Sequence, residues 1–467
     1  MSYVPLTGGS YVARSLTVGA QTCINLMPEA MPQAEGEPTA FAHYPTPGLR
    51  YIGVVGGGAW RGMYRATNGT LFGVVGNNVV VNADTGGSIV GTIATTSGPV
   101  SMSDNSVNLI LVDGSAAGYT VLLATGAFSA ISDPAFYGAD RVEMLDTFFV
   151  LNRPGTNQFY VSRSVAVTFD PLYIAAKAGL DTLVSIAVFR RELWLFGTRY
   201  TEIWSDVGAA DFPFQVFSGG IEHGCVAAAS VAHTDGAVFW LDRSRDGEGI
   251  VLRGQNYNAM RVSTHAIEAA IRSYSKITDA VGWIYQIDGH IVYVLTFPTA
   301  GATWCFDLAT SLWHQWQSGG GIHRGICHSA FSNYNLVGDV TNGNLYALDP
   351  NVYTDNGAPI QRTRAFPHLE SNADRIFYTR FTADMQCGLV PVGQPEPQLS
   401  LRWSDDGGFS FGAPVALGMG LNGAANTSLQ FRRLGYSRGG RVFEVSWNAP
   451  VATVLQGAWV ETVAGAT

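Results

Sequence analysis

A recurring pair of short apolar strands constrains the fold of this chain more than any other feature of its sequence. Between Leu71 and Leu348 an apolar run, a polar turn and a second apolar run occur seven times. The second residue of the first run recurs after 38 to 53 residues, close to the ~40–50 residues of one blade of a β-propeller. Each unit is a small sheet that cannot bury both faces alone, so we predict an all-β fold with a propeller of six to seven blades. These second residues are Phe72, Ile110, Phe149, Trp194, Phe239, Val292 and Leu336.

Two regions flank the repeat, which covers residues 58–357. Residues 1–57 contain widely spaced prolines, which lack the N–H that regular structure uses, so we expect an extended N-terminal arm without regular structure. In residues 358–467 the repeat stops and apolar residues alternate with polar ones. This alternation predicts a C-terminal β-sandwich-like domain. The prolines on which this expectation rests are Pro28, Pro32, Pro38, Pro45 and Pro47.

One segment inside the repeat has a helical pattern. Ser263 and Thr264 are capping residues, and Ile267, Ile271 and Tyr274 follow at the spacing of one helical face. We therefore predict a helical insert near 264–274, which accounts for the longest repeat spacing.

The composition favours assembly and argues against a DNA-gripping surface. Charged residues make up 13% of the chain, about half of the roughly 25% usual in soluble domains. The net charge is −9 and no run of basic residues occurs, whereas sequence-independent DNA binding needs clustered cations. A surface with so few charges is expected to be covered in part by other subunits.

The sequence also limits the compartment. The N-terminus lacks the basic and apolar segments of a signal peptide, and the longest uncharged windows are rich in turn residues, so no membrane span is expected. The five cysteines are scattered without a CxxC pair, which disfavours disulfides and structural zinc. Synthesis in a reducing cytoplasm fits these features.

No motif in the sequence predicts catalysis, a cofactor or a metal. His323, Cys327 and His328 are three possible metal ligands, but neighbouring strand residues point to opposite faces, so a structural role is favoured. Trp304 and Trp313 (with Trp316) fit either a sugar-binding groove or blade cores. Paired acids for glycoside hydrolysis stay open as an alternative, although nothing singles out two of them.

One short segment near the C-terminal end matches a specific hairpin motif. Residues 404–411 match the pattern S-x-D-x-G-x-[ST]-aromatic, the Asp-box hairpin found in sialidase-type propellers. Its aspartate is expected to bind the turn amides and its aromatic ring to pack beneath them, so its role is structural. The residues that carry it are Ser404, Asp406, Gly408, Ser410 and Phe411.

Several stretches resemble the tail hub proteins of short-tailed double-stranded DNA bacteriophages, also called packaged-DNA stabilisation or tail nozzle proteins. The similar stretches are 21–29 and 45–49 in the arm, 201–204, 211–214 and 221–225 in the middle, 263–274 with 289–290, 297–298, 303–304, 307 and 313–314 after it, and 432–435 with 441–445 near the C-terminus.

The resemblance implies a non-enzymatic virion component made in the cytoplasm of a host bacterium. It implies assembly as a homo-hexamer below the portal and its adaptor ring, in contact with other tail proteins such as a tailspike or tail needle. The ring would close the DNA channel after packaging and conduct the genome during ejection, without sequence-specific binding. Six copies carry 6 × −9 = −54 charges, and an acidic lumen would let DNA slide. The alternative function is a propeller that binds or cleaves glycans.

Overall fold

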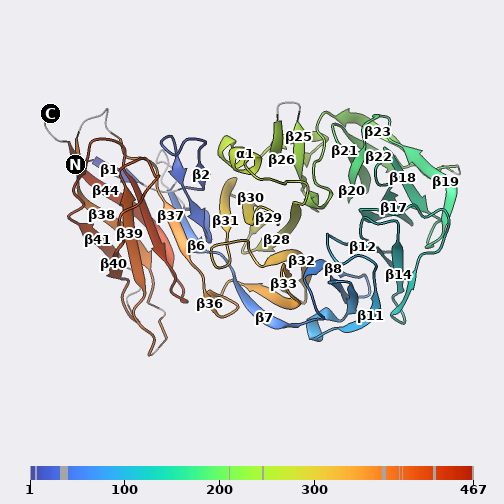
Figure 1. Ribbon diagram of the computed structural model, residues 1–467, viewed down its shortest axis with the longest axis horizontal. Helices are drawn as coiled ribbons and strands as arrows, with labels where there is room; N and C mark the ends of the chain where they lie inside the picture. The colour runs from blue at the N-terminus through green and yellow to red at the C-terminus, as the bar shows by residue number, and fades with distance from the viewer. Residues whose placement is uncertain are drawn as a thin grey trace.

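The chain folds as a seven-bladed β-propeller with a β-sandwich beside it (Figure 1). The computed structural model describes residues 2–5, 8–31, 40–209, 211–244, 247–370, 375–388, 390–391, 393–423 and 427–464. Pro32 and Pro38 lie outside these residues. The first strands of neighbouring blades contact one another, and the first strand of the last blade contacts that of the first, so the ring is closed.

The blades within the described residues are four-stranded antiparallel units. They are β8 (Trp60–Arg65), β9 (Leu71–Val75), β10 (Asn78–Val81) and β11 (Ser88–Thr92); β12 (Ser101–Asp104), β13 (Asn108–Val112), β14 (Gly118–Leu122) and β15 (Ala127–Ala130); β16 (Val142–Leu145), β17 (Phe148–Asn152), β18 (Gln158–Ser162) and β19 (Phe169–Ala176); β20 (Leu183–Phe189), β21 (Glu192–Gly197), β22 (Thr201–Asp206) and β23 (Phe214–Ile221); β24 (Ala232–Thr234), β25 (Ala237–Ser244), β26 (Gly247–Gln255) and β27 (Asn258–Arg261); β28 (Val281–Ile287), β29 (His290–Phe297), β30 (Ala302–Asp307) and β31 (Leu312–Trp316); and β32 (Gly325–Phe331), β33 (Tyr334–Asp339), β34 (Asn344–Asp349) and β7 (Gly48–Val54).

The predicted propeller is confirmed, and each predicted strand pair is the second and third strand of one blade. These middle strands pack between the neighbouring blades on both faces, so they appear in the sequence as unbroken apolar runs. All five residues of β9 are buried, for example, whereas β11 at the rim of the same blade has no buried residue. The rim strands therefore left no comparable pattern in the sequence.

The seventh blade takes its outer strand from the N-terminal arm. β7 pairs antiparallel with β34, with Leu49 opposite Leu348, and it leads directly into the first blade. The expectation that the arm lacks regular structure is wrong, because a strand completed by a distant partner leaves no local repeat. The start of β7 leaves no space for a side chain, because a Cβ at Gly48 would lie 2.1 Å from the carbonyl oxygen of Val352.

The rest of the arm joins the propeller to the C-terminal strands. β4 (Cys23–Ile24) lies between β31 of the sixth blade and β37 (Arg362–Ala365), and so makes one continuous sheet of nine strands. Asn25, which is 3% exposed, accepts from the backbone N–H of Gln317 at 2.8 Å and donates to the carbonyl oxygen of Gln361 at 2.9 Å. A single arm residue therefore binds both domains.

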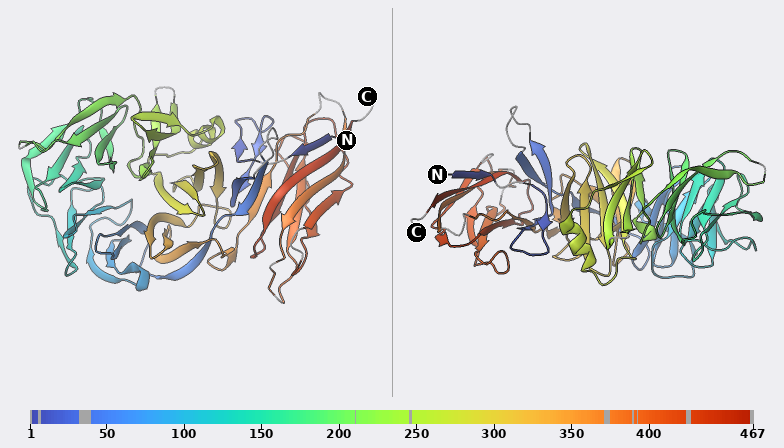
Figure 2. Two further views of the ribbon diagram at one scale, coloured as in Figure 1. Left: turned by 180° about the vertical axis from the view of Figure 1, so that it is seen from behind. Right: turned by 90° about the horizontal axis from the view of Figure 1, so that it is seen from above.

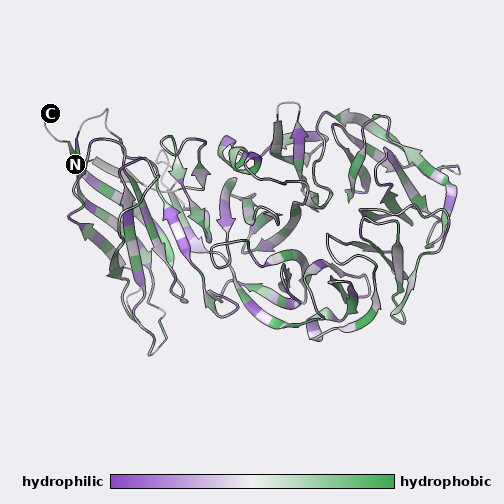
Figure 3. Ribbon diagram, viewed as in Figure 1, coloured by the Kyte–Doolittle hydropathy of each residue, from purple (hydrophilic) through white to green (hydrophobic). Residues whose placement is uncertain are grey.

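The C-terminal domain is a sandwich of two sheets (Figure 2). One sheet has the order β37-β43-β39-β40 and the other β41-β38-β44-β6-β5. Hydrophobic and hydrophilic residues alternate along its strands (Figure 3), as the sequence predicted, and rings such as Phe381 and Phe443 pack between the sheets. Residues 358–467 do not build this sandwich alone, since the arm supplies β5 and β6. The strands are β5 (Leu26–Met31), β6 (Ala40–Pro45), β38 (Ile376–Gln386), β39 (Gln398–Ser404), β40 (Val415–Gly418), β41 (Thr427–Arg432), β43 (Val442–Trp447) and β44 (Val454–Ala464).

The remaining elements are short. The helix α1 (His265–Arg272) lies between β27 and β28, with the Thr264 hydroxyl accepting from the N–H of Ile267, and it buries Ile267 and Ile271. Arg261 binds Glu268 of this helix at 2.5 Å. The others are β1 (Ser2–Pro5), β2 (Tyr11–Val12), β3 (Ala20–Gln21), β35 (Thr354–Asp355), β36 (Ala358–Pro359) and β42 (Tyr436–Ser437), and the 3-10 turns η1 (Ala83–Thr85) and η2 (Ala228–Ser230).

Candidate functional site

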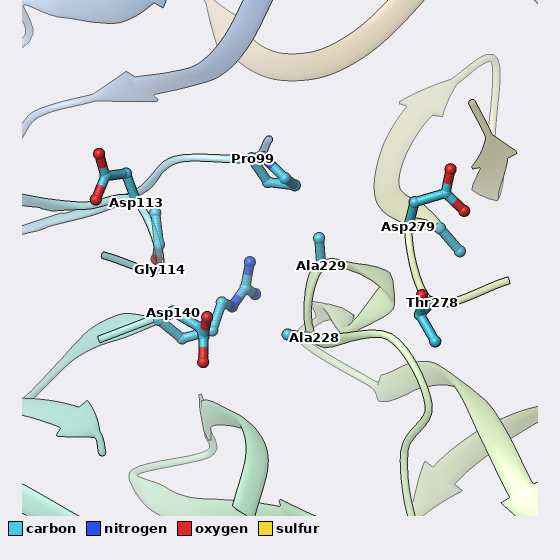
Figure 4. A pocket seen from close by; sticks show the side chains of 11 residues that line it. Pro99, Asp113, Gly114, Asp140, Ala228, Ala229, Thr278 and Asp279 are labelled. Atoms are coloured by element: carbon cyan, nitrogen blue, oxygen red, sulfur yellow. The ribbon is translucent and has the colours of Figure 1, made fainter. Parts of the chain in front are cut away.

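A concave site lies where the inner strands of the blades begin, an end of the propeller that we call the mouth. One cavity of about 200 Å³ lies among the segments that precede β12, β16, β24 and β28. Figure 4 shows the carboxylates of Asp113, Asp140 and Asp279 around one space. Arg141 also lines this cavity. A second cavity of about 460 Å³ shares Pro99 and Asp279 with it. The charged residues that line the two are Asp113, Asp140, Asp279, Arg61, Arg141 and Lys276.

Hydrogen bonds fix the charged groups of the mouth to backbone. Arg141 Nη2 donates to the carbonyl oxygen of Val231 at 3.1 Å and so links the third blade to the fifth. Arg61 donates to several carbonyl oxygens, among them those of Gly98 and Thr95, each at 2.7 Å. Such bonds hold the loops together across the propeller axis.

Two carboxyls of the mouth are shifted in opposite directions. Burial raises the pKa of Asp140 above its ordinary value, against a hydrogen bond from Asn152 at 3.0 Å. Burial also opposes ionisation of Asp113, but hydrogen bonds from Ser115 and Thr95 outweigh it and lower the pKa of this carboxyl. Both acids bind groups of the surrounding loops. The larger cavity, of about 460 Å³, has the volume of a small-molecule site.

No pattern in the sequence predicted the mouth residues. They are single residues in loops of different blades, and no spacing joins them. The sequence also provided no means of recognising Arg141 as the group that bridges two blades.

The Asp-box residues form a compact turn between β39 and β40. Ser404 Oγ donates to Asp406 Oδ1 at 2.6 Å and accepts from the N–H of Gly408 at 2.8 Å. The Ser410 N–H donates to Asp406 Oδ1 at 2.9 Å. These bonds, first from Ser404 and then from Ser410, hold the pKa of Asp406 well below its usual range. Phe411 lies under the Arg402 guanidinium at 4.7 Å.

The turn also packs against the N-terminal arm. A Cβ at Gly408 would lie 2.7 Å from the Cβ of Ala20, and one at Gly407 would lie 2.8 Å from Thr17 Cγ2. Phe411 packs against a buried cluster that includes Ala20. The motif thus lies where the arm meets the sandwich.

Replacing the Asp406 carboxylate should make the stability of the protein depend less on pH in the acidic range. Because the folded pKa of Asp406 is depressed, its contribution is present above the unfolded value of about 3.9 and is lost as the pH falls below it. We expect Asp406→Asn to lower Tm by a small amount at pH 7 and by less near pH 3. Thermal scans of both proteins over this range test it, and a difference that is constant with pH would contradict it.

The other candidates from the sequence are packed against aromatic rings. His323 lies 4.6 Å from the Trp316 ring and His328 stacks on Trp283 at 5.2 Å. Among the residues that the structure describes, no group of three His, Cys, Asp or Glu side chains is arranged to hold a metal ion. Trp304 and Trp313 (with Trp316) are 3% exposed or less. They form blade cores, so a sugar groove lined by these three is ruled out.

Comparison with known proteins identifies the family. The profile of the family described as "Bacteriophage P22 Gp10, beta-propeller" matches residues 2–353. The chain belongs to this family. It is therefore a tail hub protein, a structural component of a phage tail and hence of the virion. The match covers the arm and the propeller, whereas the Asp-box turn lies outside it.

The chain shares little sequence identity with the solved propeller structures that it resembles. No curated protein matches the chain. Among solved structures, the WD40 propeller domain of Doa1 shows 12% identity and a TM-score of 0.42, covering 64% of this chain and 97% of that one. The Pan2 WD40 domain of Neurospora crassa shows 9% identity and a TM-score of 0.44, covering 65% and 96%. Among the described residues, no helix is long and apolar enough to cross a membrane.

Proposed function

We propose that six copies of this tail hub protein form a ring below the portal and its adaptor ring. The ring closes the DNA channel after packaging and conducts the genome during ejection, in contact with a tailspike or tail needle. Membership of the tail hub family is the observation that carries this proposal. In this arrangement the DNA passage lies between the copies.

An exposed apolar patch offers a contact for such a ring. Val216 and Phe217 of β23 are 49% and 54% exposed, and Tyr257 and Met260 of the next blade are 44% and 55% exposed. The rings of Phe217 and Tyr257 lie 5.6 Å apart, so these two side chains form one surface between β23 and the turn that precedes β27. Contiguous exposed apolar groups of this kind are typical of protein interfaces.

The mass of the assembled complex tests the proposal. Light scattering of a portal and adaptor complex, before and after addition of the chain, should show a gain near six times 49.9 kDa, about 299 kDa. A gain is expected even if the free chain is a monomer, since the complex acts as the template. A well-formed complex that gains no mass would contradict the ring.

A matched pair of variants tests the patch. Phe217→Asp places a charge in the contact and should abolish most of the mass gain, because a buried unpaired charge is costly. Ile89→Asp, at a 58% exposed position on the first blade, should leave the gain unchanged. Equal gains for both variants would remove the patch from the interface.

A further inference from the structure

Three fully buried basic side chains meet at the seam between the arm, the propeller and the sandwich. Arg364 of β37, His43 of β6 and His314 of β31 are each 0% exposed. Electrostatic interaction joins His43 with both of the others, so the three form one cluster. We call it the seam cluster.

The seam cluster contains many donors without protein acceptors. Arg364 Nη1 donates to the carbonyl oxygens of Gly9 at 2.8 Å and Thr22 at 3.1 Å. Its Nε and Nη2, the edge that binds anions in a bidentate manner, have no partner among the described residues. Neither ring nitrogen of His314 and only one of His43 has a partner there.

No acid of the described chain neutralises Arg364. The ionisable group that favours its charge is the Cys23 thiol. Burial raises the pKa of this thiol to about 11 despite the guanidinium, so it carries no charge at neutral pH. Asp307, near His314, binds His290 Nδ1 at 2.8 Å and the Thr310 hydroxyl at 2.8 Å instead. An uncompensated buried cation is strongly destabilising, so the guanidinium needs a counter-charge.

The histidines do not add to the positive charge. Burial, and next the Arg364 charge, lower the pKa of His43 to about 3, and burial lowers that of His314 to about 4. At neutral pH the cluster therefore carries one charge. Its unpaired N–H groups are those of Arg364 Nε and Nη2 and one of His314, because the single N–H of neutral His43 is donated to the Gly8 carbonyl oxygen.

Gly8 of the arm lies beside the free edge of Arg364. A Cβ built on Gly8 would have Arg364 Nη2 at 3.9 Å as its one neighbour within 4 Å, its chain neighbours aside. Gly8 accepts at 2.9 Å from His43 Nε2, and Ser10 donates to the carbonyl oxygen of Trp313 at 2.8 Å. The 8–10 segment thus contacts His43 and Arg364, and it binds β31, the strand that carries His314.

We propose that the seam cluster binds one small monovalent anion of the halide class on the Nε–Nη2 edge of Arg364. A single charge matches the single guanidinium, and full burial excludes large or strongly hydrated anions. The anion fastens the arm between the propeller and the sandwich, so docking of the arm depends on it.

Bromide diffraction and salt-specific stability test this site. Crystals of the full chain soaked in sodium bromide should give an anomalous peak within hydrogen-bond distance of Arg364. In solution, the wild-type Tm should be a few degrees higher in sodium chloride than in sodium gluconate of equal ionic strength. Arg364→Met should show no such difference. The surface variant Arg65→Met, which also removes one charge, should respond as the wild type does.

Two results would overturn the proposal. One is a bromide-soaked crystal with no peak at the seam, which would mean that water alone satisfies the donors. The other is an equal chloride effect in wild type and Arg364→Met. If Arg364→Met does not fold, the wild-type bromide peak decides. Sodium phosphate at the same ionic strength should stabilise no more than gluconate, and a larger effect of phosphate would overturn the assignment to a small monovalent anion.

Discussion

Removal of residues 1–57 is expected to abolish folding of the whole chain. The deletion takes away β7, which completes the seventh blade, and β4, which joins the sixth blade to the sandwich. It also removes β5 and β6 from the second sheet of the sandwich. The open blade and the open sheet would each expose an unpaired edge, which promotes aggregation. Soluble yield, circular dichroism and thermal unfolding should show little native protein.

A point substitution separates the closure of the blade from the loss of the arm. Gly48→Ala forces a Cβ into the carbonyl oxygens of Val352 and Thr354, and overpacking of this kind costs about 1–3 kcal/mol. Gly53 lies on the same strand with nothing within 4 Å of its added Cβ, so Gly53→Ala should be close to neutral. Urea denaturation measures both variants. A truncated chain with a native melting curve, or equal effects of the two alanines, would show that β7 does not close the ring.

The sequence predicted the parts of the fold that are local. The middle strands of the blades, such as β9 and β10, form tight hairpins and are apolar throughout, so their pairing could be read from adjacent residues. The alternation of the sandwich strands was equally visible. Helix α1 carries its own cap and apolar face, and both lie within twelve residues of the chain near Thr264 and Ile271.

The features that the sequence did not show depend on partners far along the chain. β4 has two residues, and what makes it a strand is its position between β31 and β37. Its neighbour Asn25 binds residues 292 and 336 positions away. The same holds for the propeller mouth and the seam cluster. Arg364 and His314 look like ordinary strand residues until the arm brings them together.

The N-terminal arm couples the propeller to the sandwich. Because the arm fills places in the sixth blade, the seventh blade and both sandwich sheets, the domains cannot move independently while it is docked. A change of tail state that moves the sandwich against the propeller must therefore release β4 or bend the shared sheet. The seam cluster lies at this point and would respond first to such a movement.

The second large effect is expected at Lys177, one of only two lysines in the sequence. Its side chain is 0% exposed, with Nζ 2.5 Å from Asp181 Oδ1 and 3.7 Å from Glu202 Oε1. Both carboxylates also accept backbone N–H groups: Asp181 from Arg199 at 2.7 Å and Glu202 from Gly179 at 2.7 Å. Lys177→Met leaves the buried Glu202 and the mostly buried Asp181 without their cation, a change that costs about 3–5 kcal/mol. Urea denaturation should show this loss, whereas the exposed Lys276→Met should stay within about 0.5 kcal/mol of the wild type.

The pH dependence of this loss identifies its cause. Burial opposes ionisation of Asp181, but the hydrogen bond from Lys177 and those from Arg199 and Tyr200 outweigh it and lower its pKa. A depressed pKa contributes stability above the unfolded value of about 3.9, and this contribution disappears as the pH falls below it. The difference in Tm between wild type and Lys177→Met should therefore be largest at neutral pH and should narrow below pH 4, because protonated acids no longer need the lysine. If the loss came from packing alone, the difference in Tm between the two proteins would be the same at every pH. Methionine and lysine fill similar volumes, and packing contacts do not titrate.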